Sequence, residues 1–390
     1  MLQVAERMQS IPFSGIRKVF EEVTRREKKG EKIIHLEIGR PDFDTPKRIK
    51  DKALWALDQG HVHYTSNYGL PELRNAIAGK LKNDNGLEYD PGEEVIVTVG
   101  ANEAVFMAMI ALLNPGDEVL VPDPCWPHYF YCARLAGAVP VSVPLSRHQS
   151  FQPELEAFQQ RVTSSTRMLV VTSPHNPTGA VFSEEALHGL ARLSQEKDLF
   201  VISDEIYEKM VYGDAAHKSL AAFPGMRERT VLVNGLSKIY SMTGWRLGYA
   251  AAPSELASAM IRIHQYTTVC AATFAQWGGV EALCGPQQDA AEMVAEFDRR
   301  RKFVCKRLAD MKGVELVVPQ GAFYVFPYIG DLNKSPEQLA WYLLDEAKVA
   351  VVPGTVLGHY GDGFIRISYA NSYENLEQAM DNMARALAKL

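Results

Sequence analysis

The sequence predicts an α/β protein in which a doubly wound, mostly parallel sheet forms a large lobe and a smaller α+β lobe is built from both ends of the chain. Between about residues 95 and 251, short apolar runs alternate with segments of helical length. The runs are rich in β-branched residues and nearly continuous in apolar character, as expected for strands buried on both faces. At 390 residues, the chain is also long for one compact domain.

Seven runs are predicted to be the strands of the large lobe: EVIVTV, EVLVP, AVPVSV, RMLVVT, LFVIS, TVLVN and RLGYAAA. Segments 102–113, 126–136 and 183–197 have the length and composition of crossover helices. Strands that alternate with such helices favour a parallel sheet.

The C-terminal part of the sequence has a different pattern. After about residue 285, a long charged helix precedes two short strands, VELVV and AFYVF, then a helix near 335–347 and the strand FIRIS. This order is typical of an α+β lobe. We expect residues 1–45 to join residues 286–390 in a small domain, leaving 46–285 as the large, cofactor-binding domain.

Composition restricts the class of protein. A hydrophobic fraction of 47% with 23% charged residues is typical of a globular protein, and a net charge of −6 argues against a nucleic-acid or membrane partner. Five cysteines form no C-x-x-C pair, and an odd number fits a reducing compartment. The first ten residues, MLQVAERMQS, carry charges where a signal peptide has an apolar core. We therefore expect a cytoplasmic protein, and no metal site is predicted.

Polar or glycine-rich clusters follow five of the predicted strands. They read GANEA, DPCW, SPHNPTG, DEIY and GLSK. Because ligands of open α/β sheets bind beyond the carboxyl ends of the strands, we expect these clusters to form one site. Gly100 and Ala101 would bring bare backbone N–H groups to a helix N-terminus, which suits a phosphate. Arg246 in TGWRLGY would complete such an anion site as a bidentate clamp.

The remaining strand ends suit a flat, cationic ligand that carries an aldehyde. Asp204 ends a buried run and needs a cation, because burying an unpaired carboxylate costs several kcal/mol. Trp126 offers a flat ring, Asn176 lies in a rigid turn, and Tyr207 lies on the same face of a predicted helix as Asp204. Lys238 offers an amine for the aldehyde. Together with the phosphate site, these groups describe pyridoxal 5′-phosphate bound as a Schiff base.

Each of these residues, taken alone, also fits an ordinary structural role. Gly100 with Ala101 would form a simple βα turn, and Asp204 would cap a helix that opens EIYEKM. Arg246 would be a surface arginine, and Trp126 and Tyr207 would belong to the core. The combination of residues, rather than any single one, supports the cofactor prediction.

The stretch GLSKIYSMTGWRLG, residues 235–248, resembles the lysine signature of the class I aminotransferases, which are fold-type I pyridoxal-phosphate enzymes, position by position. The resemblance runs from HLEIGRPDFDTP through HYTSNYGLPELR, VGANEAV, SPHNPTG, ISDEIY and PQGAFYVFP to FIRISYA, and so covers essentially the whole chain. It implies a transaminase that moves an amino group between an L-amino acid and a 2-oxo acid. It also implies a homodimer with shared active sites.

The resemblance implies roles around the cofactor ring. Lys238 would form the Schiff base and, once freed by substrate, move the proton between the substrate Cα and the cofactor C4′. Asp204 would pair with the pyridinium nitrogen and raise its pKa. Tyr207 and Asn176 would bond the ring oxygen, and Trp126 would stack on the ring.

The resemblance also implies the groups that bind the phosphate and the substrate. The phosphate would be held by Gly100, Ala101, Asn102, Ser237 and Arg246, and by Tyr64 from a second subunit. Arg366 would grip the substrate α-carboxylate with the help of Asn176 and the Gly39 backbone, although alone it also fits an outward arginine on an edge strand. Phe13 to Ile16, Asn102 and Trp126 would line the side-chain pocket.

Two departures from the family pattern leave the preferred substrate open. Gly235 stands where many relatives carry a phosphate-binding serine, and Asn102 where some aspartate-preferring relatives carry a lysine. Two alternative functions remain: a C–S β-lyase, and a regulatory cofactor sensor, which would need a basic DNA-binding module that we do not find. The peptide bonds Asp123–Pro124 and Asn176–Pro177 are predicted to be cis.

Overall fold

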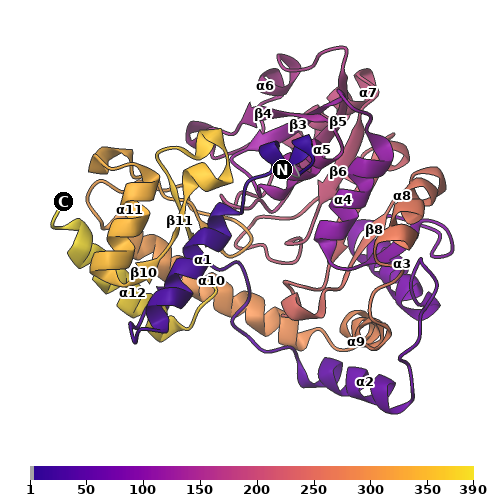
Figure 1. Ribbon diagram of the computed structural model, residues 1–390, viewed down its shortest axis with the longest axis horizontal. Coiled ribbons are helices and arrows are strands. Elements are labelled where there is room, and N and C mark those ends of the chain that lie inside the picture. The colour runs from indigo at the N-terminus through magenta and orange to yellow at the C-terminus, as the bar shows by residue number, and fades with distance from the viewer. Residues whose placement is uncertain (1–3) are drawn as a thin grey trace.

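The computed structural model describes residues 4–390, and a seven-stranded sheet forms the centre of its larger part (Figure 1). The strands are β2 (Val95–Thr98), β3 (Glu118–Asp123), β4 (Val139–Pro144), β5 (Thr166–Thr172), β6 (Phe200–Asp204), β7 (Thr230–Gly235) and β8 (Gly248–Ala251). Their order in the sheet is β2-β8-β7-β6-β5-β3-β4. Strand β8 is antiparallel to both neighbours, and all other adjacent pairs are parallel. All seven strands predicted from the sequence are confirmed.

Helices cover both faces of this sheet, which is why the central parts of its inner strands are nearly continuous in apolar character. In β5, Met168 and Val170 belong to the core under one helical layer, whereas Leu169 and Val171 belong to the core under the other. The first layer consists of α4 (Ala101–Leu112), α5 (His128–Leu135) and α8 (Ser254–Thr267). The second layer contains α6 (Leu155–Gln159) and α7 (Glu184–Glu196), and beside it lie α2 (Lys47–Asp58), α3 (Pro71–Asn85) and α9 (Thr273–Cys284). The three predicted crossover helices correspond to α4, α5 and α7.

The smaller part combines elements from both ends of the chain, so that indigo α1 lies beside the orange and yellow helices in Figure 1. Its helices are α1 (Gly15–Glu27), α10 (Gln288–Ala309), α11 (Pro336–Tyr342) and α12 (Tyr373–Leu387). Strand β1 (Ile34–His35) pairs in parallel with β10 (Val349–Ala350). An antiparallel sheet of order β11-β12-β9 combines β9 (Tyr324–Val325), β11 (Val352–Pro353) and β12 (Ile365–Ser368).

One prediction for the small lobe needs correction. The segment VELVV, residues 314–318, is not a strand: within the described chain its ladder pairing is one isolated bridge between Glu315 and Tyr328. Leu316 and Val317 pack against two different hydrophobic cores, so their apolar character reflects side-chain burial rather than sheet pairing. The helix predicted near 335–347 is confirmed as α11 followed by a π-helical turn at Leu343–Ala347.

The described helices include no candidate for crossing a membrane, because none is both long and apolar enough. All five cysteines are free thiols. Of the N-terminal stretch MLQVAERMQS, residues 1–3 lie outside the described chain, and Glu6–Ser10 form a short 3-10 helix.

Candidate active site

The amine of Lys238 lies where the large sheet meets the small lobe. Lys238 follows β7 directly, and its Nζ donates a hydrogen bond of 2.6 Å to the backbone oxygen of Gly39, which precedes α2. Burial, together with the nearby positive charges of Arg366 and Arg246, lowers the pKa of this amine to about 8. A lysine with this pKa is a better nucleophile at neutral pH than an ordinary lysine.

Asp204 at the end of β6 is a buried carboxyl with donors on both oxygens. The Tyr129 hydroxyl donates to Oδ2 at 2.8 Å, and the Ile206 backbone N–H donates to Oδ1 at 3.2 Å. The Thr172 hydroxyl in turn donates to the Tyr129 oxygen at 2.9 Å. Burial raises the pKa of Asp204 to about 6. No cation pairs with it within residues 4–390, so the site suits a cationic ligand group.

Tyr207 reaches the site through a turn and not, as predicted, from the face of a helix. Residues 206–209 form turns because the backbone N–H of Glu205 still bonds to the Val233 oxygen of β7, which prolongs the sheet pairing. The chain then closes a turn in which the Met210 N–H bonds to the Tyr207 oxygen. The Tyr207 side chain is buried, and its hydroxyl lies 2.9 Å from that of Tyr324.

The start of α4 and Arg246 form a cradle that suits a phosphate. Gly100 has a φ of +77°, and a Cβ at this position would collide with the Arg246 guanidinium. Arg246 itself has a φ of +52°, and its Nη1 donates to the Thr243 oxygen at 3.0 Å. Ala101 opens the helix, and Ser237 is buried just before Lys238. Free N–H groups, a helix N-terminus and a guanidinium are the groups that bind phosphate in proteins.

Arg366 is buried on β12, which is the central strand of its sheet, so the alternative of an outward arginine on an edge strand is wrong. Its Nη1 donates to the Asn176 side-chain oxygen at 3.1 Å, and its Nη2 donates to the Glu37 backbone oxygen at 2.7 Å. The Nε atom is buried and has no partner within the described chain. The structure thus brings Arg366, Asn176 and Lys238 to one place, where an unpaired guanidinium N–H awaits an acceptor.

Other predicted site residues lie further out. Trp126 is half-buried after β3, packed against the core that contains α4 and α5. Asn102 is exposed in the first turn of α4, and its backbone oxygen bonds to His128 Nε2 at 2.9 Å. Phe13 is fully exposed, and Tyr64 is 85% exposed. The single chain therefore does not bring Tyr64 to the cradle.

Three residues at the site were missed by the sequence analysis: Tyr129, Tyr324 and Glu37. Tyr129 lies three residues after Trp126, in the segment 126–136 predicted as a helix, and Tyr324 lies in the motif PQGAFYVFP. Neither segment shows which way its tyrosine points. The predicted cis bonds Asp123–Pro124 and Asn176–Pro177 are confirmed, and Ser173–Pro174 is also cis.

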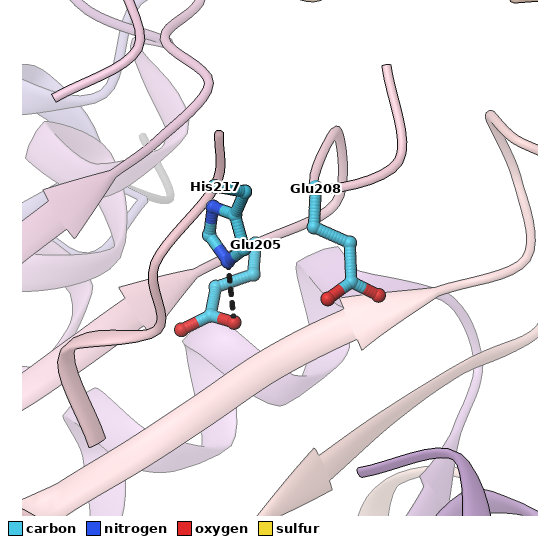
Figure 2. Close-up of side chains that lie close together, drawn as sticks. All are labelled: Glu205, Glu208 and His217. Carbon is cyan, nitrogen blue, oxygen red and sulfur yellow. Dashed lines mark hydrogen bonds and ion pairs between the residues drawn. The ribbon is translucent and has the colours of Figure 1, made fainter. Parts of the chain in front are cut away.

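One group of side chains in the described chain is spaced closely enough to hold a metal: Glu205, Glu208 and His217 (Figure 2). His217 Nε2 faces Glu205 Oε2 at 3.0 Å, and although burial opposes it, this pairing raises the pKa of His217. Glu205 also accepts bonds from two serine hydroxyls, and Glu208 pairs with Lys80. Since the lysine supplies the positive charge, these side chains form an ion-pair network beside Asp204.

Comparisons with known proteins agree with this geometry. A family model described as "Aminotransferase class I and II" matches residues 31–383. The chain is 45% identical to an aspartate aminotransferase of Pyrococcus abyssi over 388 residues, which cover 99% of this chain and 98% of that protein. It is 42% identical, with the same coverage, to the aromatic-amino-acid aminotransferase 2 of Thermococcus litoralis. The solved structure of the Thermus thermophilus aspartate aminotransferase with maleate matches with a TM-score of 0.93 at 40% identity, covering 99% of this chain and 100% of that one.

Proposed function

The chain belongs to the class I and II aminotransferases, and from that premise we propose which of its residues carry out amino-group transfer. The enzyme uses pyridoxal phosphate to move an amino group between an amino acid and a 2-oxo acid. When bound, the cofactor supplies an aldehyde that bonds reversibly to amines and a ring that withdraws electrons. The assignment of residues rests on the amine of Lys238. This amine is bonded to the Gly39 backbone oxygen and lies near the charge of Arg366, and its lowered pKa favours the unprotonated form.

Lys238 is the catalytic residue in this proposal. Its amine would hold the cofactor in the resting enzyme and, once the substrate had displaced it, would move a proton at the substrate Cα. Asp204 would pair with the protonated ring nitrogen, and the hydroxyl of Tyr129 holds the carboxyl in place. Tyr207 and Asn176 would donate hydrogen bonds to the ring oxygen, and Trp126 would cover one face of the ring.

The phosphate and the substrate carboxylate each have their own cationic group. The phosphate lies in the cradle of Gly100 and Arg246, with further contacts from Ala101, Asn102 and Ser237. Arg366 binds the substrate α-carboxylate, with Asn176 and the Gly39 backbone beside it. Since Arg366 already donates two hydrogen bonds within the protein, its guanidinium is held in one orientation before substrate arrives.

The substrate is proposed to be an L-amino acid with a free α-carboxylate, and the side-chain preference is settled by a donor panel. The similar proteins are named for aspartate and for aromatic amino acids, so the panel contains aspartate, phenylalanine and alanine. Turnover of each donor is measured with 2-oxoglutarate as acceptor. In a separate assay without an acceptor, absorbance follows the conversion of the cofactor from its aldehyde to its amine form. A transaminase converts stoichiometrically. A cysteine S-conjugate is tested as well, because its Cβ–S bond can break with release of a thiol. Release of pyruvate and ammonia from it without this conversion would instead identify a β-lyase.

The enzyme is proposed to act as a homodimer in which Tyr64 contacts the phosphate bound by the partner subunit. The support is an exposed apolar surface: Tyr64 is 85% exposed and Tyr266 is 87% exposed. The segment around Tyr64 is fixed in place, because Thr273 Oγ1 donates to the His63 oxygen at 2.6 Å and Asn67 Nδ2 donates to the Val269 oxygen at 2.9 Å. A fixed, exposed aromatic surface of this kind favours an interface with a second copy.

We also propose a cytoplasmic location and a division into two domains, residues 46–285 and residues 1–45 with 286–390. The five free cysteines support a reducing compartment. A hydrophobic core joins elements of α10, α12, β9 and β12 and supports the small domain, and Tyr207, Met210 and Tyr212 of the large lobe also belong to it. Limited proteolysis tests the division, because cleavage is expected first near the two proposed boundaries.

A further inference from the structure

Tyr324 is a buried residue to which the proposed function gives no role. It lies on β9, directly opposite Ser368 of β12, the strand that carries Arg366. Its hydroxyl lies 2.9 Å from the hydroxyl of Tyr207, and the two rings meet edge to face with centroids 5.8 Å apart. Within residues 4–390, neither hydroxyl has another hydrogen-bond partner.

Counting protons assigns a direction to this hydrogen bond. Each phenol has one proton to donate. According to the proposed function, on which this inference rests, Tyr207 donates its proton to the ring oxygen of the cofactor. The proton between the two tyrosines then belongs to Tyr324. A hydroxyl that accepts a hydrogen bond becomes a stronger donor, because successive bonds polarise one another.

The surroundings of Tyr324 favour this role. The Arg366 guanidinium carbon lies 4.5 Å from the centroid of the Tyr324 ring, and a positive charge so close makes the phenol a stronger donor. Gly39 packs directly on the hydroxyl, since a Cβ at that position would collide with the Tyr324 oxygen. Both tyrosines are buried, so water does not compete for the bond.

We propose that Tyr324 is a positioning residue for Tyr207: its hydroxyl orients and strengthens the hydrogen bond that Tyr207 donates to the cofactor ring oxygen. Tyr324 itself does not touch the cofactor. Because it lies between Arg366 and Tyr207, it joins the substrate-carboxylate site to the cofactor site. A stronger bond to the ring oxygen draws away its negative charge, which disfavours protonation of the nitrogen that joins Lys238 to the cofactor.

The test is a spectral pH titration of the enzyme with its cofactor bound, because protonation of that nitrogen changes the absorbance. Tyr207→Phe is expected to raise the apparent pKa of the bound cofactor by roughly 1–2. Tyr324→Phe is expected to raise it by roughly 0.2–0.6, and to add nothing in the Tyr207→Phe background. Tyr369→Phe is the control, because its buried hydroxyl donates to the Ala322 oxygen at 3.2 Å, away from Tyr207.

Three results would overturn the proposal. A shift with Tyr207→Phe but none with Tyr324→Phe would remove the role of Tyr324 and leave that of Tyr207. Equal shifts of Tyr324→Phe with and without the Tyr207 hydroxyl would show that Tyr324 acts by another route. If Tyr207→Phe causes no shift, Tyr207 does not have its proposed role. The proposed role of Tyr324, which acts through Tyr207, is then rejected as well. If Tyr324→Phe fails to fold, 3-fluorotyrosine at position 324, a more acidic phenol of nearly the same shape, is expected to lower the pKa of the bound cofactor.

Discussion

The amine of Lys238 and the backbone oxygen of Gly39 are 2.6 Å apart, although they are 199 residues apart in the chain. This hydrogen bond joins the turn after β7 to the segment that precedes α2. It also fixes the position of the lysine amine, near the charge of Arg366. The amine that we propose to be catalytic is therefore oriented by the protein itself.

Lys238→Ala is expected to leave the fold intact and to abolish turnover. The variant loses both cofactor attachment and proton transfer, and the loss of general acid–base catalysis alone is worth roughly 10²–10⁴ in rate. The measurement is turnover together with the absorbance spectrum of the bound cofactor. The control is Lys312→Ala, an exposed lysine, which is expected to change stability by no more than about 0.5 kcal/mol and to keep full activity. A Lys238→Ala enzyme that transaminates at the normal rate would contradict the proposal.

The cofactor-free enzyme is expected to take up pyridoxal phosphate faster as the pH rises through about 8, where the rate is half-maximal, and to reach a plateau above about pH 9. Only the unprotonated amine attacks the aldehyde, and burial lowers the pKa of Lys238 to about 8. An ordinary lysine, with a pKa of 10.5, would instead show a rate that keeps rising up to pH 10. Stopped-flow absorbance between pH 6 and 10 distinguishes the two curves. A continued rise above pH 9 would show that the amine is not perturbed.

Arg366→Lys is expected to lower kcat/KM for amino acids by roughly 10–10²-fold, because lysine keeps the charge but cannot make a bidentate bond to a carboxylate. The cofactor should still bind, since its phosphate and ring contact other residues. Steady-state kinetics with several donors is the measurement, and the loss should be similar for all of them because each has the same α-carboxylate. Arg385→Lys, on the exposed side of α12, is the matched control. A loss confined to one donor would indicate that Arg366 binds the side chain instead.

The stability of the fold is expected to fall as the pH rises from about 6.5 to 9, because of His35. The hydrogen bond to Glu37 at 2.7 Å, assisted by Glu27, raises the pKa of His35 to about 9. The folded state therefore favours the protonated imidazole of His35. The stabilisation of the fold by the protonated His35–Glu37 pair is complete below pH 6.5 and is lost as the pH passes through 9. Urea midpoints of the native protein and His35→Gln across this range test the effect, which is expected to be on the order of 1–3 kcal/mol because the pair is half-buried. Parallel pH curves for the two proteins would contradict it.

Two inactive variants are expected to restore activity when mixed, if each active site uses Tyr64 from the partner. Lys238→Ala lacks the amine, and Tyr64→Ala is expected to hold the cofactor weakly. A mixed dimer contains one site with neither defect, so unfolding and refolding an equal mixture should restore about one quarter of the native sites. Activity is measured at limiting cofactor. Failure to restore any activity, with mixed dimers demonstrated by a tag on one variant, would rule out the shared site.

The seven strands of the large sheet are predictable because a strand buried on both faces leaves an unbroken apolar run, as in β5 and β7. The residues at the strand ends are predictable as a group because the carboxyl ends of parallel strands lie at one edge of the sheet. The helix expected after Asp204 is not formed because the Glu205 N–H is still paired with Val233. That pairing depends on the neighbouring strand, which a local sequence pattern does not contain.

The site residues that escaped prediction act through tertiary contacts. Tyr129 and Tyr324 are ordinary aromatic residues in their own segments, and only the packing of two elements directs their hydroxyls to Asp204 and Tyr207. Glu37 contributes a backbone oxygen to Arg366, and no side-chain pattern reports on a backbone group. Sequence motifs therefore indicate the side chains proposed to bind ligands better than the residues that orient those side chains.

The pairing of the Glu37 backbone oxygen with Arg366 also has a consequence for synthesis of the chain. The two residues are 329 positions apart, so the ribosome has made all seven strands of the large sheet before Arg366 exists. Every strand of the central sheet ends by residue 251, and domains generally fold in the order in which they are made. The site that we propose for the substrate carboxylate is thus completed only after the sheet. A nascent chain whose sheet is already assembled still lacks this site until Arg366 has emerged from the ribosome.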